Sequence, residues 1–298
     1  MTSTSLSLAH SLLGHQEPVR LVAFGPDGLM VTADVDMQVI VWRDNVQVTS
    51  LDMRSENPRH RPHDRLRSAV FDETGDRLFL SAGTRLEVVS SVSGEQILRY
   101  HAPEFWPFML ASPQGLALDS DGGLVASFDN GSFEKWSKTL ELCYRRKNRE
   151  APVWFGVDGV TRRMVGTDGH TLTTWDLETG SRIQRQPLDD HAYNFVYNAR
   201  TGVAMVRYAD KIVLWHAMTL EVIDSIPLPP SPPVMAMDAE GEVYAYACGP
   251  DVCLRWSGTS REVVVPADGL RFVCLSFDAQ GRLWAGRSDG QVHCWTVG

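Results

Sequence analysis

Tryptophan recurs along this chain at nearly constant spacing, each time at the end of a run of alternating apolar residues. One run ends on valine instead, and the seven closing residues are Trp42, Val89, Trp136, Trp175, Trp215, Trp256 and Trp295. Successive closures lie 47, 47, 39, 40, 41 and 39 residues apart. A period of roughly 40 to 45 residues is typical of the four-stranded blades of a β-propeller. The spacing therefore predicts an all-β chain, a seven-bladed β-propeller.

Each period contains four short segments in which apolar and polar residues alternate. The first period reads VRLVAF (19–24), LMVTAD (29–34), QVIVW (38–42) and VQVTSL (46–51). This alternation favours β-strands, and the Asp-Gly pairs between segments supply the positive φ of tight turns. We therefore expect four antiparallel strands in every blade.

The two ends of the sequence predict how the last blade is completed. Only three residues follow Trp295, so the seventh period lacks a fourth strand, whereas SLSLAHSLL (5–13) precedes the first period. An N-terminal strand closing the last blade would cover an exposed strand edge. Seven blades account for the whole length, which predicts a single domain over residues 1–298.

The segment GHQEPVRLVAFGPDGLMVTADVDMQVIVW (14–42) resembles a WD40 repeat, which opens on Gly-His and closes on tryptophan. The resemblance covers nearly the whole chain, although the repeats match unevenly. It implies a buried hydrogen-bonded network within the first blade, formed by His15, Thr32, Asp36 and Trp42. Because no other segment carries this full set, we expect most blades to be held by strand pairing and apolar packing alone.

Composition argues against several classes of function. The net charge of −9 and the pI near 5.5 oppose nucleic-acid binding. The sequence contains no secretory leader and no apolar run long enough to span a membrane. Five cysteines, an odd number, fit reduced thiols better than disulfides, with a Cys248–Cys253 bridge as the alternative. We expect a cytoplasmic, monomeric protein without membrane contact.

Three motifs suggest a catalytic or cofactor site, but each falls on a predicted turn. GRSDG (286–290) matches the Gly-x-Ser-x-Gly nucleophile motif, which requires a strand-to-helix turn. DSDGG (119–123) begins like a calcium loop but lacks the closing glutamate. WDLETGSRI (175–183) resembles the cofactor-docking motif of quinoprotein propellers, but Ile183 replaces its tryptophan. We therefore expect no catalytic residue, no cofactor and no metal.

The elaborate connections of the predicted blades lie on one face. Strand order places the connections between blades on the same face as the turns between second and third strands. Four of these connections are unusual in length or composition, namely 54–67, 101–110, 145–150 and 227–234. The turns of the opposite face are short. This asymmetry predicts one functional face.

Charged and aromatic residues of this face are the candidate partner-binding residues. Nine of the 28 basic residues lie in 54–67 and 145–150, and a basic patch on an acidic body should attract an acidic segment. The aromatic residues of the loop at 105–108 either fold inward over the channel or anchor a partner. The candidates are Arg59, Arg61, Arg65, Arg67, Phe105, Trp106, Phe108, Arg145, Arg146, Lys147 and Arg149. The alternative is that these loops are solvated and bind nothing.

Two functional hypotheses follow. The resemblance implies a non-enzymatic scaffold that binds a protein or peptide, and reversing Arg145, Arg146 and Arg149 to Glu should then remove the partner without lowering the melting temperature. The alternative is a propeller enzyme or small-molecule sensor that uses the central channel, which would need converging carboxylates, histidines or a metal. The polar residues of the inner strands fall instead where turns begin, chiefly at Asp72, Asp119, Asp158, Asp238 and Asp278.

Overall fold

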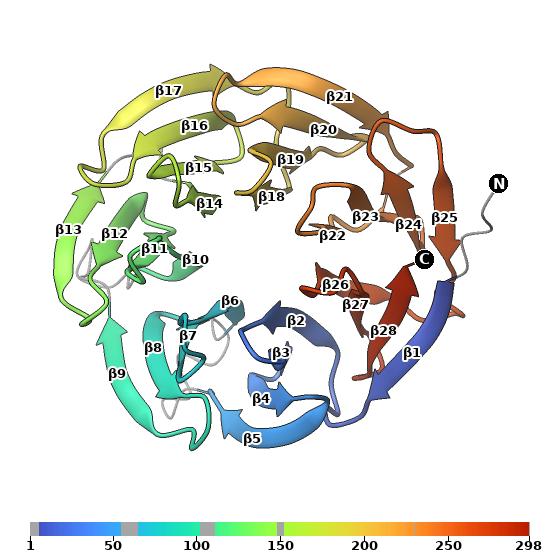
Figure 1. Cartoon of the computed structure of the whole chain (residues 1–298), viewed down its shortest axis with the longest axis horizontal. Helices are drawn as coiled ribbons and strands as arrows, with labels where there is room; N and C mark the ends of the chain where they lie inside the picture. Colours follow the sequence, from blue (N-terminus) through green and yellow to red (C-terminus); the bar gives the residue numbers. More distant parts are fainter. Residues whose placement is uncertain (1–5, 55–64, 102–110, 148–151, 230, 298) are drawn as a thin grey trace. The chain divides into compact units, whose positions relative to one another are not determined.

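The computed structural model describes residues 6–54, 65–101, 111–147, 152–229 and 231–297. Its strands pair into seven four-stranded antiparallel sheets, the blades, numbered here from 1 to 7 along the chain. These residues contain no helix, and therefore none that could cross a membrane. The chain is an all-β, seven-bladed β-propeller, as the tryptophan spacing predicts (Figure 1).

The chain divides into two compact units, Ala23–Asp189 and Met1–Val22 with Asp190–Gly298. Blades 1 to 4 belong to the first unit, except that the strand β2 begins before its boundary. In chain order, the strands of these blades are β2 (Val19–Phe24), β3 (Leu29–Asp34), β4 (Gln38–Arg43) and β5 (Val46–Asp52); β6 (Leu66–Phe71), β7 (Arg77–Ala82), β8 (Arg85–Ser90) and β9 (Gln96–His101); β10 (Pro113–Leu118), β11 (Leu124–Phe128), β12 (Ser132–Trp136) and β13 (Leu142–Lys147); and β14 (Trp154–Asp158), β15 (Arg163–Thr167), β16 (Thr171–Asp176) and β17 (Arg182–Pro187).

Blades 5 to 7 belong to the second unit. Their strands are β18 (Asn194–Asn198), β19 (Val203–Arg207), β20 (Lys211–His216) and β21 (Glu221–Pro227); β22 (Met235–Met237), β23 (Val243–Cys248), β24 (Asp251–Trp256) and β25 (Glu262–Val265); and β26 (Phe272–Phe277), β27 (Leu283–Arg287), β28 (Val292–Val297) and β1 (Leu6–Leu12).

The N-terminal strand completes blade 7. Strand β1 pairs antiparallel with β28, with Leu8 opposite Trp295, and the two strands lie side by side in Figure 1. Without β1, the outer edge of β28 would have unpaired backbone groups. The prediction of an N-terminal closing strand is confirmed.

The tryptophan that closes each period lies on the third strand of its blade, where it packs between neighbouring sheets. Trp175 on β16 is 1% exposed and lies opposite Met164 of β15. Trp295 on β28 belongs to an apolar cluster formed by residues of blades 6 and 7, which also contains Phe272. The outer strands are more exposed, and every residue of β17 is exposed. The sequence period therefore corresponds to one position on the third strand, which is buried in every blade except blade 6, where Trp256 is half-buried.

Candidate functional site

The carboxylates of the inner strands are committed to turns. Asp119, at the end of β10, accepts hydrogen bonds at Oδ1 from the backbone N–H of Asp121 at 3.0 Å and of Gly123 at 2.6 Å. Its other oxygen lies 2.8 Å from Nζ of Lys135. Equivalent turn contacts are made by Asp72, Asp158, Asn198, Asp238 and Asp278. These buried groups stabilise the blades, as their position in the sequence predicts.

The three motifs that suggest chemistry also lie in turns. GRSDG spans the turn from β27 to β28, DSDGG the turn from β10 to β11, and WDLETG the turn from β16 to β17. The Ser288 hydroxyl accepts a hydrogen bond from the backbone N–H of Arg271 at 3.1 Å. Ser288 therefore lies in a strand-to-strand turn, and the nucleophile motif has no structural counterpart here.

Blade 1 contains only part of the network that the family resemblance implies. The indole Nε1 of Trp42 donates to the hydroxyl of Thr32 at 2.8 Å, and His15 is buried. The prediction is wrong for Asp36, which is exposed. Asp34 is buried in its place and accepts the backbone N–H of Asp36 and Gln38, each at 3.0 Å. Asp36 points outward because the next residue, Met37, adopts a positive φ of 69° and takes the buried position.

In blades 2 and 7, the expectation of strand pairing and apolar packing alone is also wrong. In blade 2, which lacks the tryptophan, the buried carboxylate of Glu87 lies 3.1 Å from Nε of Arg85 and 3.2 Å from Nε of Arg99. In blade 7, Trp284 donates its Nε1–H to Asp278 at 2.8 Å. These groups form ion pairs in blade 2 and a hydrogen bond in blade 7. Spacing along the chain does not predict them, because Arg99 and Trp284 come from other strands than the carboxylates they meet.

Arg145 belongs to such an internal network rather than to a free loop. Its Nε lies 2.5 Å from Oε1 of the fully buried Glu134, and its Nη2 donates to the Tyr100 hydroxyl at 2.6 Å. Burial, followed by the charge of Glu134, raises the pKa of Tyr100 to about 12. Reversing Arg145 to Glu would place a second carboxylate beside a buried one. Contrary to the prediction from sequence, we therefore expect this reversal to lower the melting temperature.

Arg146 is partly engaged as well. Its Nε donates to the backbone oxygen of Thr179 at 2.8 Å, and its guanidinium carbon lies 5.6 Å from the centre of the Tyr144 ring. Together with Arg145 and Lys147 it lies on the outer strand β13, not in a connection as predicted. Arg145 and Arg146 therefore have different contacts on this strand, which a run of like charges in the sequence does not show.

Arg65 and Arg67 retain the character expected of a partner-binding residue. Both are exposed at the start of the inner strand β6. Partial burial and the charge of Arg65 lower the pKa of Arg67 below its usual value. The remaining candidates lie outside the described residues, namely Arg59, Arg61, Phe105, Trp106, Phe108 and Arg149.

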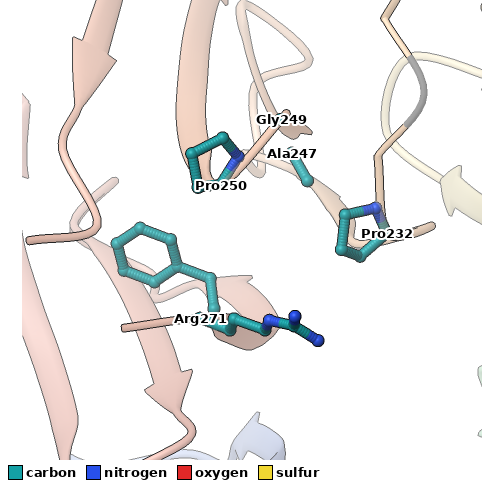
Figure 2. Close-up of a pocket in the computed structure, with 6 residues that line it drawn as sticks. Pro232, Ala247, Gly249, Pro250 and Arg271 are labelled. Carbon is teal, nitrogen blue, oxygen red and sulfur yellow. The ribbon is translucent and has the colours of Figure 1, made fainter. Parts of the chain in front are cut away.

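A pocket of about 360 Å³ lies between blades 6 and 7, in the second unit. It is formed by the connection before β22, the turn between β23 and β24, and the start of β26, and Figure 2 shows Arg271 facing the two proline rings. The lining residues are Pro232, Ala247, Gly249, Pro250, Arg271 and Phe272. The sequence does not predict this pocket, because its lining residues come from three separate parts of the chain and none of these parts contains a recognisable motif.

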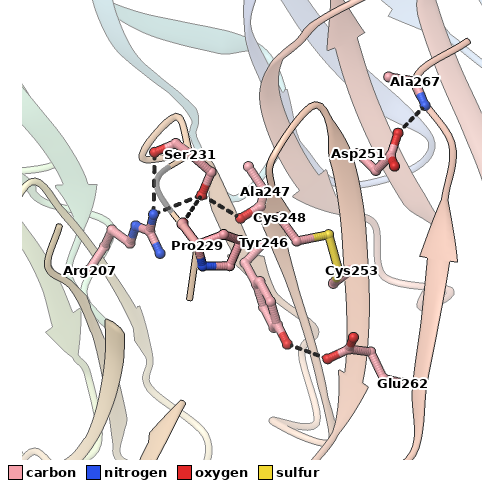
Figure 3. The surroundings of a disulfide bond; sticks show 10 residues. All are labelled: Arg207, Pro229, Ser231, Tyr246, Ala247, Cys248, Asp251, Cys253, Glu262 and Ala267. Atoms are coloured by element: carbon pink, nitrogen blue, oxygen red, sulfur yellow. Dashed lines mark hydrogen bonds between the residues drawn. A yellow bond between two sulfur atoms is a disulfide. The ribbon is translucent and has the colours of Figure 1, made fainter. Parts of the chain in front are cut away.

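The wall at Pro232 is fixed by a buried arginine. Arg207, at the end of β19, is 2% exposed and donates from Nη2 to the hydroxyl of Ser231 at 2.8 Å. That hydroxyl lies 2.9 Å from the backbone oxygen of Ala247, to which it can donate (Figure 3). Burial lowers the pKa of Arg207, and its Nη1 has no acceptor among the described residues. The proline-rich connection is thereby tied to strand β23.

The opposite wall is formed by a hairpin that a disulfide crosses. Cys248 and Cys253 are bonded, with their Cα atoms 5.9 Å apart, so the expectation of five reduced thiols is wrong and the alternative bridge is present (Figure 3). The bond forms because the turn from β23 to β24 brings residues five apart within bonding range. The three other cysteines are free, and Cys143 is exposed.

Metal ligands do not converge in this part of the molecule. Among the described residues, no group of three or more His, Cys, Asp or Glu side chains could hold a metal ion. Of the described residues that line the pocket, Arg271 is the one that carries a charge. The arrangement is suited to binding through apolar contact and one cation.

Comparison with known families agrees with the fold. Residues 6–43 match the model of the family described as "WD domain, G-beta repeat", and this segment contains β1 to β4. Comparison with curated proteins finds no match. Propellers of this family are typically protein-interaction scaffolds and are generally non-enzymatic. The chain is therefore a seven-bladed β-propeller whose residues 6–43 match a WD40 repeat.

Proposed function

We propose that this protein is a non-enzymatic scaffold that binds a protein or peptide partner through the ends of its sheets that carry the connections between blades. The supporting observation is that acidic and basic residues occupy opposite ends of the inner strands. At the ends of these strands, carboxylates are buried in turns, as for Asp119 and Asp238. At their starts, arginines are exposed, as for Arg65 and Arg271. The exposed charges are therefore available for recognition, whereas the groups that acid–base chemistry would require are occupied.

The proposal is tested by capture of a partner with the full chain. We expect the wild type to retain a partner that the double variant Arg65→Glu and Arg67→Glu releases, because the reversed charges would repel an acidic segment. The interaction should weaken with salt. A matched control is Arg43→Glu, an exposed arginine at the end of β4.

The controls separate loss of binding from loss of fold. All three proteins should melt at the same temperature, because the substituted side chains are exposed. If the double variant retains the partner as the wild type does, these two arginines are not the contact. If no protein or peptide binds the wild type in a saturable manner, the scaffold function itself is refuted.

A further inference from the structure

The pocket between blades 6 and 7 combines one unpaired cation with rigid apolar walls. The guanidinium of Arg271 is exposed, and the structure gives it no hydrogen-bond or ion-pair partner among the described residues. Its backbone is fixed, because its N–H donates to the Ser288 hydroxyl at 3.1 Å and its oxygen accepts the Ser288 N–H at 2.9 Å. The side chain is therefore anchored at its base, and its charge is free to pair with an anion.

The apolar walls are ordered before any ligand binds. Pro232 and Pro250 have ring-fixed backbones. Phe272 is 5% exposed, and its ring meets Trp295 edge-on at 5.9 Å between centroids. Gly249 has a positive φ of 76°, and a Cβ placed there would meet no atom within 4 Å, so the pocket is open at this position. A site that needs little ordering loses little free energy when it binds.

The hairpin and the proline-rich connection are tied at several points. The Cys248–Cys253 bond closes the turn that carries Gly249 and Pro250. Asp251 accepts the backbone N–H of Ala267 at 2.8 Å, which fixes the turn to the connection that leads to Arg271. The Ser231 bridge to Ala247 holds the other side. The walls therefore keep their separation independently of a ligand.

We propose that this pocket binds an acidic segment of the partner, with one apolar side chain inside the cavity and a neighbouring Asp or Glu carboxylate on Arg271. The inference rests on the scaffold function proposed above and names the chemistry that its partner presents. A single guanidinium offers the paired N–H groups that one carboxylate accepts. A phosphate dianion would keep part of its charge uncompensated there, because the described residues place no second cation in the lining of the pocket. The cavity volume lies in the range of small ligand sites.

Three pools of synthetic hexapeptides test the proposal on the full chain. The first pool carries Leu, Met or Phe followed by Asp or Glu at its centre; the second replaces the acid with Asn or Gln, and the third replaces the apolar residue with Ser. We expect only the first pool to bind. Arg271→Gln should weaken this binding about fivefold to tenfold, Arg271→Lys should weaken it less, and Arg43→Gln should leave it unchanged.

A second readout locates the bound peptide. In protein labelled with 5-fluorotryptophan, the Trp295 resonance, identified by its loss in Trp295→Phe, should shift when the first pool is added, because Trp295 contacts Phe272. Equal binding to wild type and Arg271→Gln, or binding without a shift at Trp295, would overturn the pocket assignment while leaving the scaffold function standing. Absence of binding by every pool also overturns it, and the capture experiment then decides the scaffold function separately.

Discussion

Indole nitrogens at equivalent positions of this chain have different surroundings. Trp42 donates to Thr32, whereas the buried Nε1 atoms of Trp136, Trp175 and Trp215 have no acceptor among the described residues. All four side chains are buried on third strands, so they contribute apolar area to the same degree. Their contributions to stability should differ by the hydrogen bond alone.

A pair of substitutions measures this difference. Trp42→Phe removes both apolar area and the bond to Thr32, whereas Trp215→Phe removes apolar area from an indole without an acceptor. We expect Trp42→Phe to lower the free energy of unfolding by about 1 kcal/mol more than Trp215→Phe. Urea unfolding of both variants gives the two values. Equal losses would show that the Thr32 bond contributes nothing to stability.

His293 should make the fold sensitive to acid. Burial, and then the neighbouring charge of Arg287, lower the pKa of this imidazole in the folded state, where Arg287 Nη1 lies 2.9 Å from its Nδ1. As the pH falls through about 6.5, the unfolded chain takes up a proton at this position while the folded chain resists it. The free energy of unfolding should therefore decrease on acidification.

The His293→Gln variant isolates this contribution. Its free energy of unfolding should change less than that of the wild type between about pH 7.5 and pH 5.5. The exposed His216 provides the control, because His216→Gln should follow the wild type. Unfolding by urea at several pH values gives the comparison. Identical pH profiles for His293→Gln and the wild type would refute the assignment.

Single residues were the hardest feature to predict from sequence. The sequence shows that Arg145 lies in a basic run, but not that Glu134 and Tyr100, from two other strands, meet its guanidinium. The choice between Asp34 and Asp36 depends on the positive φ of one residue in the turn. Such details are decided by neighbours in space, which spacing along the chain does not report.

At the scale of strands and turns, the hairpin of β23 and β24 carries the most specific prediction. The bridge between Cys248 and Cys253 leaves three free cysteines of the five in the chain. Thiol titration of the denatured, unreduced protein should therefore give three thiols, and five after reduction. A value of five without reductant would show that the bridge is not formed in the isolated protein.

Removing the bridge should lower stability without unfolding the chain. The closed loop is short, and the loss of its entropic constraint on the unfolded state is about 2 kcal/mol. Cys248→Ser with Cys253→Ser should show a loss of this order in urea unfolding. A matched control is Cys143→Ser, at an exposed free cysteine. If the double variant were as stable as the control, the bridge would not constrain the unfolded chain.

Strands and turns could be predicted from sequence where residues close together in the chain determine them. The turns at DSDGG and GRSDG follow from Asp-Gly pairs and from Asp side chains that accept backbone N–H groups, both of which are local in sequence. The placement of residues 145–147 was wrong because strand β13 continues through a basic segment that lacks apolar alternation. Pairing with β12 extends that strand, and pairing is not a local property.

At the scale of the whole molecule, the seven sheets follow from the repeated period, because each period supplies one antiparallel sheet, the last of which β1 completes. The pocket could not be predicted in the same way. Its walls come from the connections before β22 and β26 and from one turn, and these segments do not follow the repeated pattern of the strands. The sequence therefore predicts the frame well and the binding surface poorly.

The closing strand gives a prediction for the full chain. Deleting residues 1–13 removes β1 and exposes the outer edge of β28, which is then free to pair with another chain. We expect the truncated protein to aggregate or to melt well below the full chain. Size-exclusion chromatography and thermal melting compare the two. A truncated protein that is as soluble and as stable as the full chain would show that β1 is dispensable.

The pairing of β1 with β28 also sets the order of events during synthesis. Strand β1 is made first, yet its partner is made last, with Leu6 opposite Val297. A contact between residues so distant in sequence forms late and slowly. Until the last sheet is made, the nascent chain therefore carries an unpaired strand at its front, and in this interval it is most exposed to pairing with a neighbouring nascent chain.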